Sequence, residues 1–284
     1  MYLNQLKKEY ESLKQDKKNL LDLIDEAELA EQVYNSNAIE NSTLSLKETE
    51  RILFEMDYEL GRKVSSRELF EAKNLARVMK YIANLEYSRE LNVETILMLH
   101  LMLISNIDDQ IAGRFRGVGE YVRVGAHIAP PPEEVNKLIS EALVDYSSDL
   151  NGNFLDKIAR FHLRFEQIHP FNDGNGRIGR VLINYQLMKI GFPPIIIRDK
   201  EKKVYYRSFV EFNDRGKCDL LSKLLDLGVK ESVHKRLAYL KGLKIVPLTD
   251  FAKENGENIP AILNAAKRQT VPAFREKGRW KIGV

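Results

Sequence analysis

The segment from His169 to Arg180 reads HPFNDGNGRIGR and places several chemically active side chains within twelve residues. It contains one imidazole, one carboxylate, two arginines and two glycines that flank an asparagine. An imidazole has an ordinary pKa of about 6.5 and can accept a proton from a hydroxyl nucleophile. These residue types at this spacing predict a site for phosphate chemistry rather than a segment of the core.

The centre of the segment has the features of an anion-binding helix terminus. Gly174, Asn175 and Gly176 begin a predicted helix, so we expect their backbone N–H groups to be free and the glycines to let a ligand approach closely. Arg177 and Arg180 lie three residues apart on one flank of that helix, where each guanidinium can bind phosphate oxygens. This combination indicates a nucleotide polyphosphate as the ligand class.

Asp173 directly precedes the anion-binding residues, where a carboxylate would repel a bare anion. It suits Mg²⁺, which is usually held by one or two carboxylates together with substrate phosphates. The alternative is a polar joint between two helices, stabilised by pairing of Asp173 with Arg177. That alternative leaves His169 and Arg180 without a reason, so we favour the functional interpretation.

The motif is expected at the joint between two buried helices. Residues 156–168 are predicted to form the first helix, which ends at His169 because a residue before proline is excluded from helical geometry. The second helix is predicted to end at Gly191. The apolar positions at helical spacing are Ile158, Phe161, Phe165 and Ile168 in the first helix and Ile178, Val181, Leu182, Tyr185 and Met188 in the second.

The rest of the chain is predicted to be mainly helical as well. Residues 1 to about 33 have apolar positions at helical spacing without Pro or Gly, which predicts a packed helix. Asn41 can end the next helical stretch, and Ser45 with Glu48 forms a predicted capping box. The alternating residues 121–124 lie among glycines and predict a short strand or hairpin.

Composition limits the classes of protein to which the chain can belong. With 284 residues, 44% hydrophobic and 30% charged, it has room for one large globular domain with or without a small second one. The single cysteine, Cys218, excludes an intramolecular disulfide and a multi-cysteine zinc site. The charged N-terminus and the lack of a run of about 20 apolar residues predict a cytoplasmic protein without membrane association.

The motif resembles that of the Fic family, HPFx[D/E]GNGRxxR, at every defined position. The family is α-helical and typically transfers AMP from ATP to a hydroxyl of a target protein. The resemblance implies that His169 is the general base and that Asp173 holds Mg²⁺. It also implies that the loop from Gly174 to Gly176, including Asn175, binds the phosphates with Arg177, and that Arg180 contacts the terminal phosphate of ATP.

Two further stretches resemble parts of the same family. The segment YVRVGAHI resembles the flap that aligns an extended segment of the target protein and borders the nucleotide. A later segment matches the region that closes over the adenine. The matching residues are Val122, Arg123, Val124 and Gly125 in the flap and Tyr205, Tyr206 and Asn213 near the adenine.

A third stretch, SNAIEN, matches the inhibitory signature [ST]xxxE[GN] of the family. Read alone, Ser36 and Glu40 lie four residues apart on one helix face and would be ordinary surface residues. The resemblance instead implies that Glu40 pairs with Arg180 and occupies the arginine that the γ-phosphate of ATP needs. In some relatives the same glutamate supports removal of AMP from a modified protein, and the sequence leaves that alternative open.

These observations predict a mainly α fold with a short β-hairpin flap. The C-terminal segment is predicted to form a helix over 249–255, a second helix with Pro260 in its first turn and a hairpin with its tip at 276–278. With its stretch PAFREKGRWKIG it resembles a small winged helix-turn-helix domain. The predicted regions are residues 1–90, with the inhibitory helix around 33–41, the Fic core over 91–226, and the C-terminal domain over 240–284. The resemblance to the family covers roughly residues 30 to 226. A homodimer is compatible with this organisation.

The C-terminal region carries most of the positive charge. Between His234 and Val284 there are eleven Lys and Arg against four Asp and Glu, a balance of +7, in a chain whose net charge is +3. Two hypotheses are equally weighted: a DNA-binding face, which would make the protein a regulator with a nucleotide-sensing site, and a packing or dimerisation module whose basic residues face water. The predicted basic face consists of Lys267, Arg268, Arg275, Lys277, Arg279 and Lys281.

Overall fold

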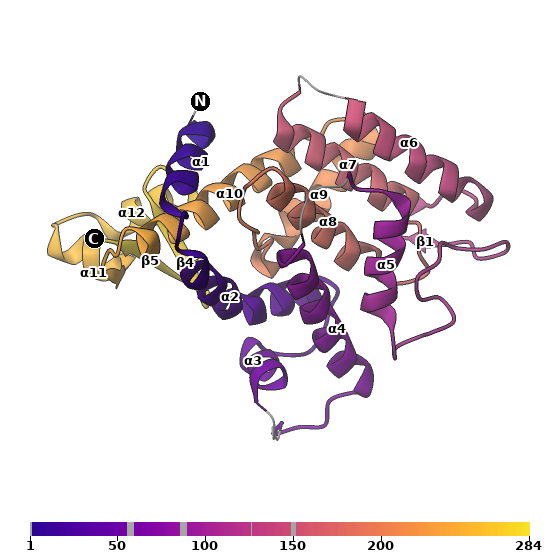
Figure 1. The fold of residues 1–284 in the computed structure, drawn as a ribbon, viewed down its shortest axis with the longest axis horizontal. Coiled ribbons are helices and arrows are strands. Elements are labelled where there is room, and N and C mark those ends of the chain that lie inside the picture. The colour runs from indigo at the N-terminus through magenta and orange to yellow at the C-terminus, as the bar shows by residue number, and fades with distance from the viewer. Residues whose placement is uncertain (1, 56–59, 86–89, 126, 149–151) are drawn as a thin grey trace.

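The computed structural model describes residues 2–55, 60–85, 90–125, 127–148 and 152–284. These residues confirm the mainly helical fold, with twelve α-helices and two small antiparallel sheets (Figure 1). No helix among them has both the length and the apolar character needed to cross a lipid bilayer. The helices are α1 (Tyr2–Leu13), α2 (Lys18–Ile39), α3 (Leu46–Phe54), α4 (Ser66–Ala83), α5 (Val93–Ile104), α6 (Val135–Ser148), α7 (Phe154–Ile168), α8 (Asn175–Lys189), α9 (Lys202–Arg215), α10 (Asp219–Leu240), α11 (Leu248–Glu254) and α12 (Ile259–Lys267), with short 3-10 turns η1 (Pro132–Glu134) and η2 (Asp199–Glu201).

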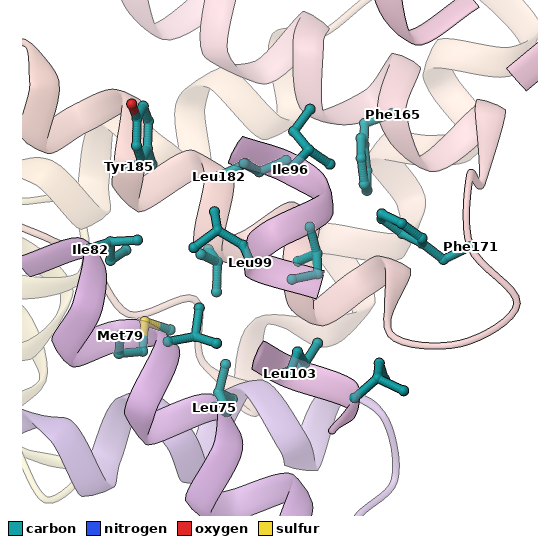
Figure 2. Packing of buried hydrophobic residues seen from close by; sticks show 14 of the residues in the cluster. Leu75, Met79, Ile82, Ile96, Leu99, Leu103, Phe165, Phe171, Leu182 and Tyr185 are labelled. Carbon is teal, nitrogen blue, oxygen red and sulfur yellow. The ribbon is translucent and has the colours of Figure 1, made fainter. Parts of the chain in front are cut away.

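Helices α7 and α8 flank the motif and are buried on two sides. One hydrophobic cluster joins them to α4 and α5, and Figure 2 shows Phe165 of α7 and Leu182 of α8 within it. A second cluster joins their opposite faces to α1, α9 and α10 and includes Leu163 and Ile183. Because both helices are packed on two sides, the loop between them is held on a rigid base.

The N-terminal region consists of two helices where the sequence predicted one. The chain turns between α1 and α2, where Asp16 has a φ of 61°. Helix α2 then continues without interruption to Ile39, so the predicted inhibitory segment is the last part of a 22-residue helix. Asn41 has a φ of 67°, the left-handed geometry that a residue just beyond a helix end often adopts. The capping box of Ser45 and Glu48 is confirmed.

The predicted flap is a short hairpin, and its two strands are β1 (Arg123–Val124) and β2 (His127–Ile128). They pair antiparallel, with Arg123 opposite Ile128 and Val124 opposite His127. The hairpin confirms the prediction made from alternating residues among glycines. Residue 126, at its turn, lies outside the described residues.

The C-terminal region contains the predicted helices and hairpin and one strand more. Its strands are β3 (Ile245–Pro247), β4 (Ala273–Glu276) and β5 (Arg279–Gly283), in the order β3-β5-β4. Strand β3 was not predicted, because three residues beside a proline give no periodic signal. Figure 1 shows this region at one end of the molecule, next to α1 and the start of α2.

Three of the six residues of the predicted basic face of the C-terminal region, Arg275, Lys277 and Lys281, are paired with carboxylates of the chain. The Arg275 side chain is only 17% exposed and pairs with Glu231 at 2.6 Å and Glu201 at 3.0 Å. Six of the eleven basic residues after position 233 form ion pairs of this kind. The other five residues and their partners are Lys235 with Glu28 and Glu276, Arg236 with Asp25 and Glu28, Lys241 with Glu9, Lys277 with Glu50, and Lys281 with Glu276.

Glu231 of α10 is the carboxylate that joins two arginine side chains. It accepts hydrogen bonds from Arg275 and forms an ion pair with Arg198. Replacing Glu231 with Gln keeps its shape but leaves two poorly exposed guanidinium groups without their main partner. We expect Glu231→Gln to lower the free energy of unfolding by about 3 kcal/mol, measured by urea denaturation. The control is Glu141→Gln on α6, where a 45% exposed carboxylate pairs with Arg164; an equal loss in both variants would contradict the prediction.

Candidate active site

Arg180 of α8 is a deeply buried charged group of the motif, with 4% of its side chain exposed. Its guanidinium donates to the Ser36 hydroxyl at 2.9 Å, to the Ser36 carbonyl oxygen at 2.8 Å and to Glu40 Oε1 at 2.9 Å. Burial alone would lower the Arg180 pKa, but the Glu40 carboxylate outweighs it and raises that pKa above its ordinary value. Arg180 therefore stays charged and is held by the end of α2.

Gly176 leaves the space that the Glu40 carboxylate occupies. A Cβ at this position would collide with Glu40 Oε1 and would lie 3.1 Å from Arg180 Nη1. The carboxylate thus lies over the first turn of α8, whose N–H groups have no intrahelical acceptor. An anionic ligand would approach the same place.

His169 lies in a left-handed backbone conformation, with φ 47° and ψ 63°, directly after α7. This geometry is uncommon for residues other than glycine and is often found at functional sites. Its ring also hydrogen-bonds the backbone carbonyl of Glu166. Burial is the main reason that the His169 pKa is lowered to about 4, so its imidazole is neutral near pH 7 and can accept a proton.

Arg116 and Asn175 hold the loop in this shape. The Arg116 guanidinium donates to the carbonyl oxygens of His169 at 2.8 Å and Pro130 at 2.9 Å, and the side chain is almost fully buried. Asn175 uses its side-chain amide to bind both the N–H and the C=O of Phe171. Arg116 was missed because it lies more than fifty residues before the motif, without a local pattern.

Asp173 is ionised, and both of its carboxylate oxygens are engaged. Oδ1 accepts from the Gly174 N–H at 2.6 Å and from Arg177 at 3.1 Å, and Oδ2 pairs with Arg67. The Gly174 N–H is therefore not free, contrary to prediction. Burial would raise the Asp173 pKa, but the charges of Arg177 and Arg67 outweigh it and lower that pKa.

The described residues contain no group of three or more His, Cys, Asp or Glu placed to bind a metal. A site with one carboxylate nevertheless fits Mg²⁺, because the cation can complete its coordination with water and substrate phosphates. Asp173 is ionised and partly exposed beside the anion-binding loop, so its chemistry is compatible with that role.

Glu166 and His162 form a buried polar pair beneath the motif, and the sequence analysis missed both. Glu166 Oε1 and His162 Nδ1 have no hydrogen-bond partner. The Glu166 pKa is raised to about 8, mainly by burial and secondly by the charge of Glu40. Burial and then Arg180 lower the His162 pKa to about 3, so both side chains are neutral near pH 7. Their positions seven and three residues before His169, on one helix face, could have revealed them.

A cavity of about 340 Å³ lies between the motif, the flap and α9. The predicted adenine-side residues Tyr205, Tyr206 and Asn213 line it, and Tyr205 is nearly fully buried with its hydroxyl 2.8 Å from His162. Among the four predicted flap residues, Val124 lines the cavity, whereas Val122, Arg123 and Gly125 do not. The remaining lining residues are Glu40, His127, Leu163, Glu166, Gln167, His169, Gly176, Arg180, Phe209, Val210 and Phe212.

A second cavity, of about 440 Å³, has a polar lining that includes Asp173 and Arg177. Glu40, His169 and Gly176 line both cavities, so the two spaces meet at the candidate base. An aromatic compartment joined to a polar compartment that contains Arg177 and the N-terminus of α8 has the form needed to bind the base and the phosphates of a nucleotide.

Comparison with known proteins gives matches over most of the chain. Residues 90–187 match the model of the Fic/DOC family. The chain is 33% identical over 208 residues to the Protein adenylyltransferase Fic of Drosophila willistoni, across 69% of this chain and 40% of the relative. It is 30% identical over 266 residues to the protein of that name from Drosophila melanogaster, across 87% of this chain and 50% of the relative. The chain thus spans about half, or less, of the length of these curated relatives.

Solved structures show the same fold. A Fic domain containing signaling protein from Bacteroides thetaiotaomicron superimposes with a TM-score of 0.73 at 22% identity, over 85% of this chain and 97% of the other. Fic-1 from C. elegans gives a TM-score of 0.65 at 26% identity, over 84% of this chain and 71% of the other. A Fic family protein from Desulfovibrio desulfuricans covers 99% of this chain and 95% of its own, with a TM-score of 0.67 at 21% identity.

The raised pKa of Glu166 makes a prediction about stability. Between about pH 4.5 and 8 the unfolded chain releases the Glu166 proton while the folded chain keeps it, so this group lowers stability as pH rises through that window. Glu166→Gln should therefore be more stable than the wild type at pH 8, by about 2 kcal/mol or more, and about equal at pH 4.5. Urea denaturation at both pH values measures this, and a difference that does not grow with pH would rule the prediction out.

Proposed function

Residues 90–187 form a domain of the Fic/DOC family, and on this premise we propose that the protein is an adenylyltransferase that transfers AMP from ATP to a hydroxyl of a target protein. The observation that carries the proposal is the meeting of the two cavities at His169, with a neutral imidazole between an aromatic and a phosphate-binding compartment. The names of the curated relatives support it.

In the proposed reaction, a target Ser, Thr or Tyr hydroxyl oxygen attacks the α-phosphorus of ATP. A new oxygen–phosphorus bond forms, the bond to the leaving pyrophosphate breaks, and the hydroxyl proton moves to His169. Because Nδ1 of the ring faces Glu166, 3.9 Å from its Oε2, we assign Nε2 as the nitrogen that accepts the proton. The flap is the edge along which an extended target segment would align.

The phosphate-binding groups proposed are the N-terminus of α8 at Asn175 and Gly176, and the guanidinium groups of Arg177 and Arg180. Arg177 supports this role, since its side chain is 4% exposed and its Nε and Nη1 lack hydrogen-bond partners that a phosphate would supply. Asp173 would hold Mg²⁺, which neutralises charge on the phosphates during phosphoryl transfer.

We propose further that the protein is autoinhibited. Glu40 occupies the Arg180 guanidinium that the γ-phosphate would need, and its negative charge repels a phosphate placed there. Ser36 adds two hydrogen bonds from the same helix, at Nε and Nη2, which hold the Arg180 guanidinium beside Glu40.

Removal of AMP from a modified target remains the alternative for the same site, with Glu40 positioning the attacking water. The DNA-binding alternative is disfavoured, because Arg275, Lys277 and Lys281 of the predicted face form ion pairs within the chain. Lys267, Arg268 and Arg279 of that face are exposed, and Lys277 is exposed as well although it pairs with Glu50. A homodimer and a cytoplasmic location remain predictions.

We predict that Glu40→Gly transfers AMP at least about tenfold faster than the wild type, because Arg180 becomes available to ATP and one charged hydrogen bond is worth about that factor. The measurement is incorporation of label from α-labelled ATP into protein, followed by mass spectrometry to identify the transferred group as AMP.

The matched control is Glu26→Gly, the same change at an exposed position of the same helix, which should behave as the wild type. Absence of label in Glu40→Gly would overturn the proposal, and so would label that survives in the double variant with His169→Ala. AMP removal from a pre-labelled target that persists in Glu40→Gly would exclude Glu40 as the group that positions water.

A further inference from the structure

Four charged side chains form a closed ring beside the anion-binding loop. Arg67 and Glu71 come from the first two turns of α4, and Asp173 and Arg177 come from the motif. Arg67 pairs with Oδ2 of Asp173, and Oδ1 of the same carboxylate lies 3.1 Å from Arg177 Nη2. Glu71 Oε1 lies 3.1 Å from both Arg177 Nη1 and Arg67 Nε, which closes the ring.

The ring occupies the two motif residues to which metal and phosphate binding are assigned. Asp173 is held by the Arg67 guanidinium at Oδ2, while its Oδ1 accepts the hydrogen bond from Gly174. Arg177 is held by the Glu71 carboxylate, in an ion pair whose geometry at Nη1 is not that of a hydrogen bond. Both residues of α4 line the polar cavity, so they lie inside the space that the phosphates would enter.

We propose that Arg67 and Glu71 are an internal substitute for the metal–phosphate pair: Arg67 holds Asp173 in place of the divalent cation, and Glu71 holds Arg177 in place of a phosphate. This inference rests on the proposed function, because it assumes that a nucleotide with its metal binds the polar cavity. It describes a contact separate from that of Glu40, on a different helix and with different arginines.

The charges allow the exchange without leaving any group unpaired. Arg67 and Glu71 are four residues apart on α4 and already contact one another at 3.1 Å, so they remain an ion pair after release. Asp173 would then pair with the metal and Arg177 with the phosphate. The Arg67 side chain is 55% exposed, so it can withdraw from the cavity towards solvent. The pair of Arg67 with Asp173, whose side chains are 55% and 32% exposed, is also weak enough for a ligand to displace.

The test of Arg67 uses the metal alone. We expect Arg67→Gln to bind Mn²⁺, followed by electron paramagnetic resonance in nucleotide-free protein, about two- to fivefold more tightly than the wild type, because Asp173 no longer has a competing cation. An unchanged or weaker Mn²⁺ affinity would overturn the role of Arg67.

The test of Glu71 uses a non-hydrolysable ATP analogue in the Glu40→Gly background, by titration calorimetry. Glu71→Gln should bind the analogue about two- to fivefold more tightly, because Arg177 has lost its competing carboxylate. A purely structural pair would give the opposite result, since loss of support for Arg177 would weaken binding. Unchanged or weaker binding therefore overturns the role of Glu71.

Arg51→Gln and Glu55→Gln are matched controls, because these residues form the same Arg–Glu pair at a spacing of four, 3.0 Å apart, at the end of α3. Both should leave Mn²⁺ and nucleotide affinity unchanged, and equal effects in controls and ring variants would contradict the proposal. The Mn²⁺ test needs no nucleotide, so it separates this inference from the proposed function. If Glu40→Gly transferred no AMP while Arg67→Gln still bound Mn²⁺ more tightly than the wild type, the proposed function alone would be overturned.

Discussion

The ion pair between Arg180 and Glu40 is the interaction on which the state of the whole site depends. Arg180 is buried at the wall of the first cavity, and a charge in such a place requires a partner. In this structure Glu40 and Ser36 supply it, which fixes the end of α2 over the first turn of α8. Burial, and after it the same negative charge of Glu40, keeps the nearby Glu166 protonated. In the proposed function a nucleotide enters by replacing one anion with another, not by filling an empty site.

The position of α2 is also fixed at a distance from the site. Glu31 on this helix accepts a hydrogen bond from the backbone N–H of Lys277 and pairs with Arg198, so the C-terminal region contacts the helix that carries Glu40. Many basic residues of the C-terminal region thus pair with carboxylates from earlier parts of the same chain. The contact of Glu40 with Arg180 is supported by packing of α2 from Ile24 to Ile39 rather than by a single salt bridge.

The sequence predicted the parts of the site that local residues determine. The glycines, the proline after His169 and the helical periodicities on both sides specify the loop, because each acts on its own backbone. The contact of Glu40 with Arg180 was expected only through the resemblance to a family signature. By contrast, Arg67 and Asp173 lie 106 residues apart, and their contact follows from the packing of α4 against α8. The ion pairs of the tail were not predictable for the same reason, because a count of charges does not show which carboxylates face them.

The measurement that tests the central claim most directly compares the affinities of ADP and ATP in the wild type and in Glu40→Gly. Glu40 occupies the place of the γ-phosphate alone, so the wild type should prefer ADP over ATP, whereas Glu40→Gly should bind ATP at least as tightly as ADP. Titration calorimetry at fixed magnesium gives both ratios. If the ratio of the two affinities were the same in the two proteins, the γ-phosphate would not compete with Glu40, and the proposed basis of autoinhibition would be wrong.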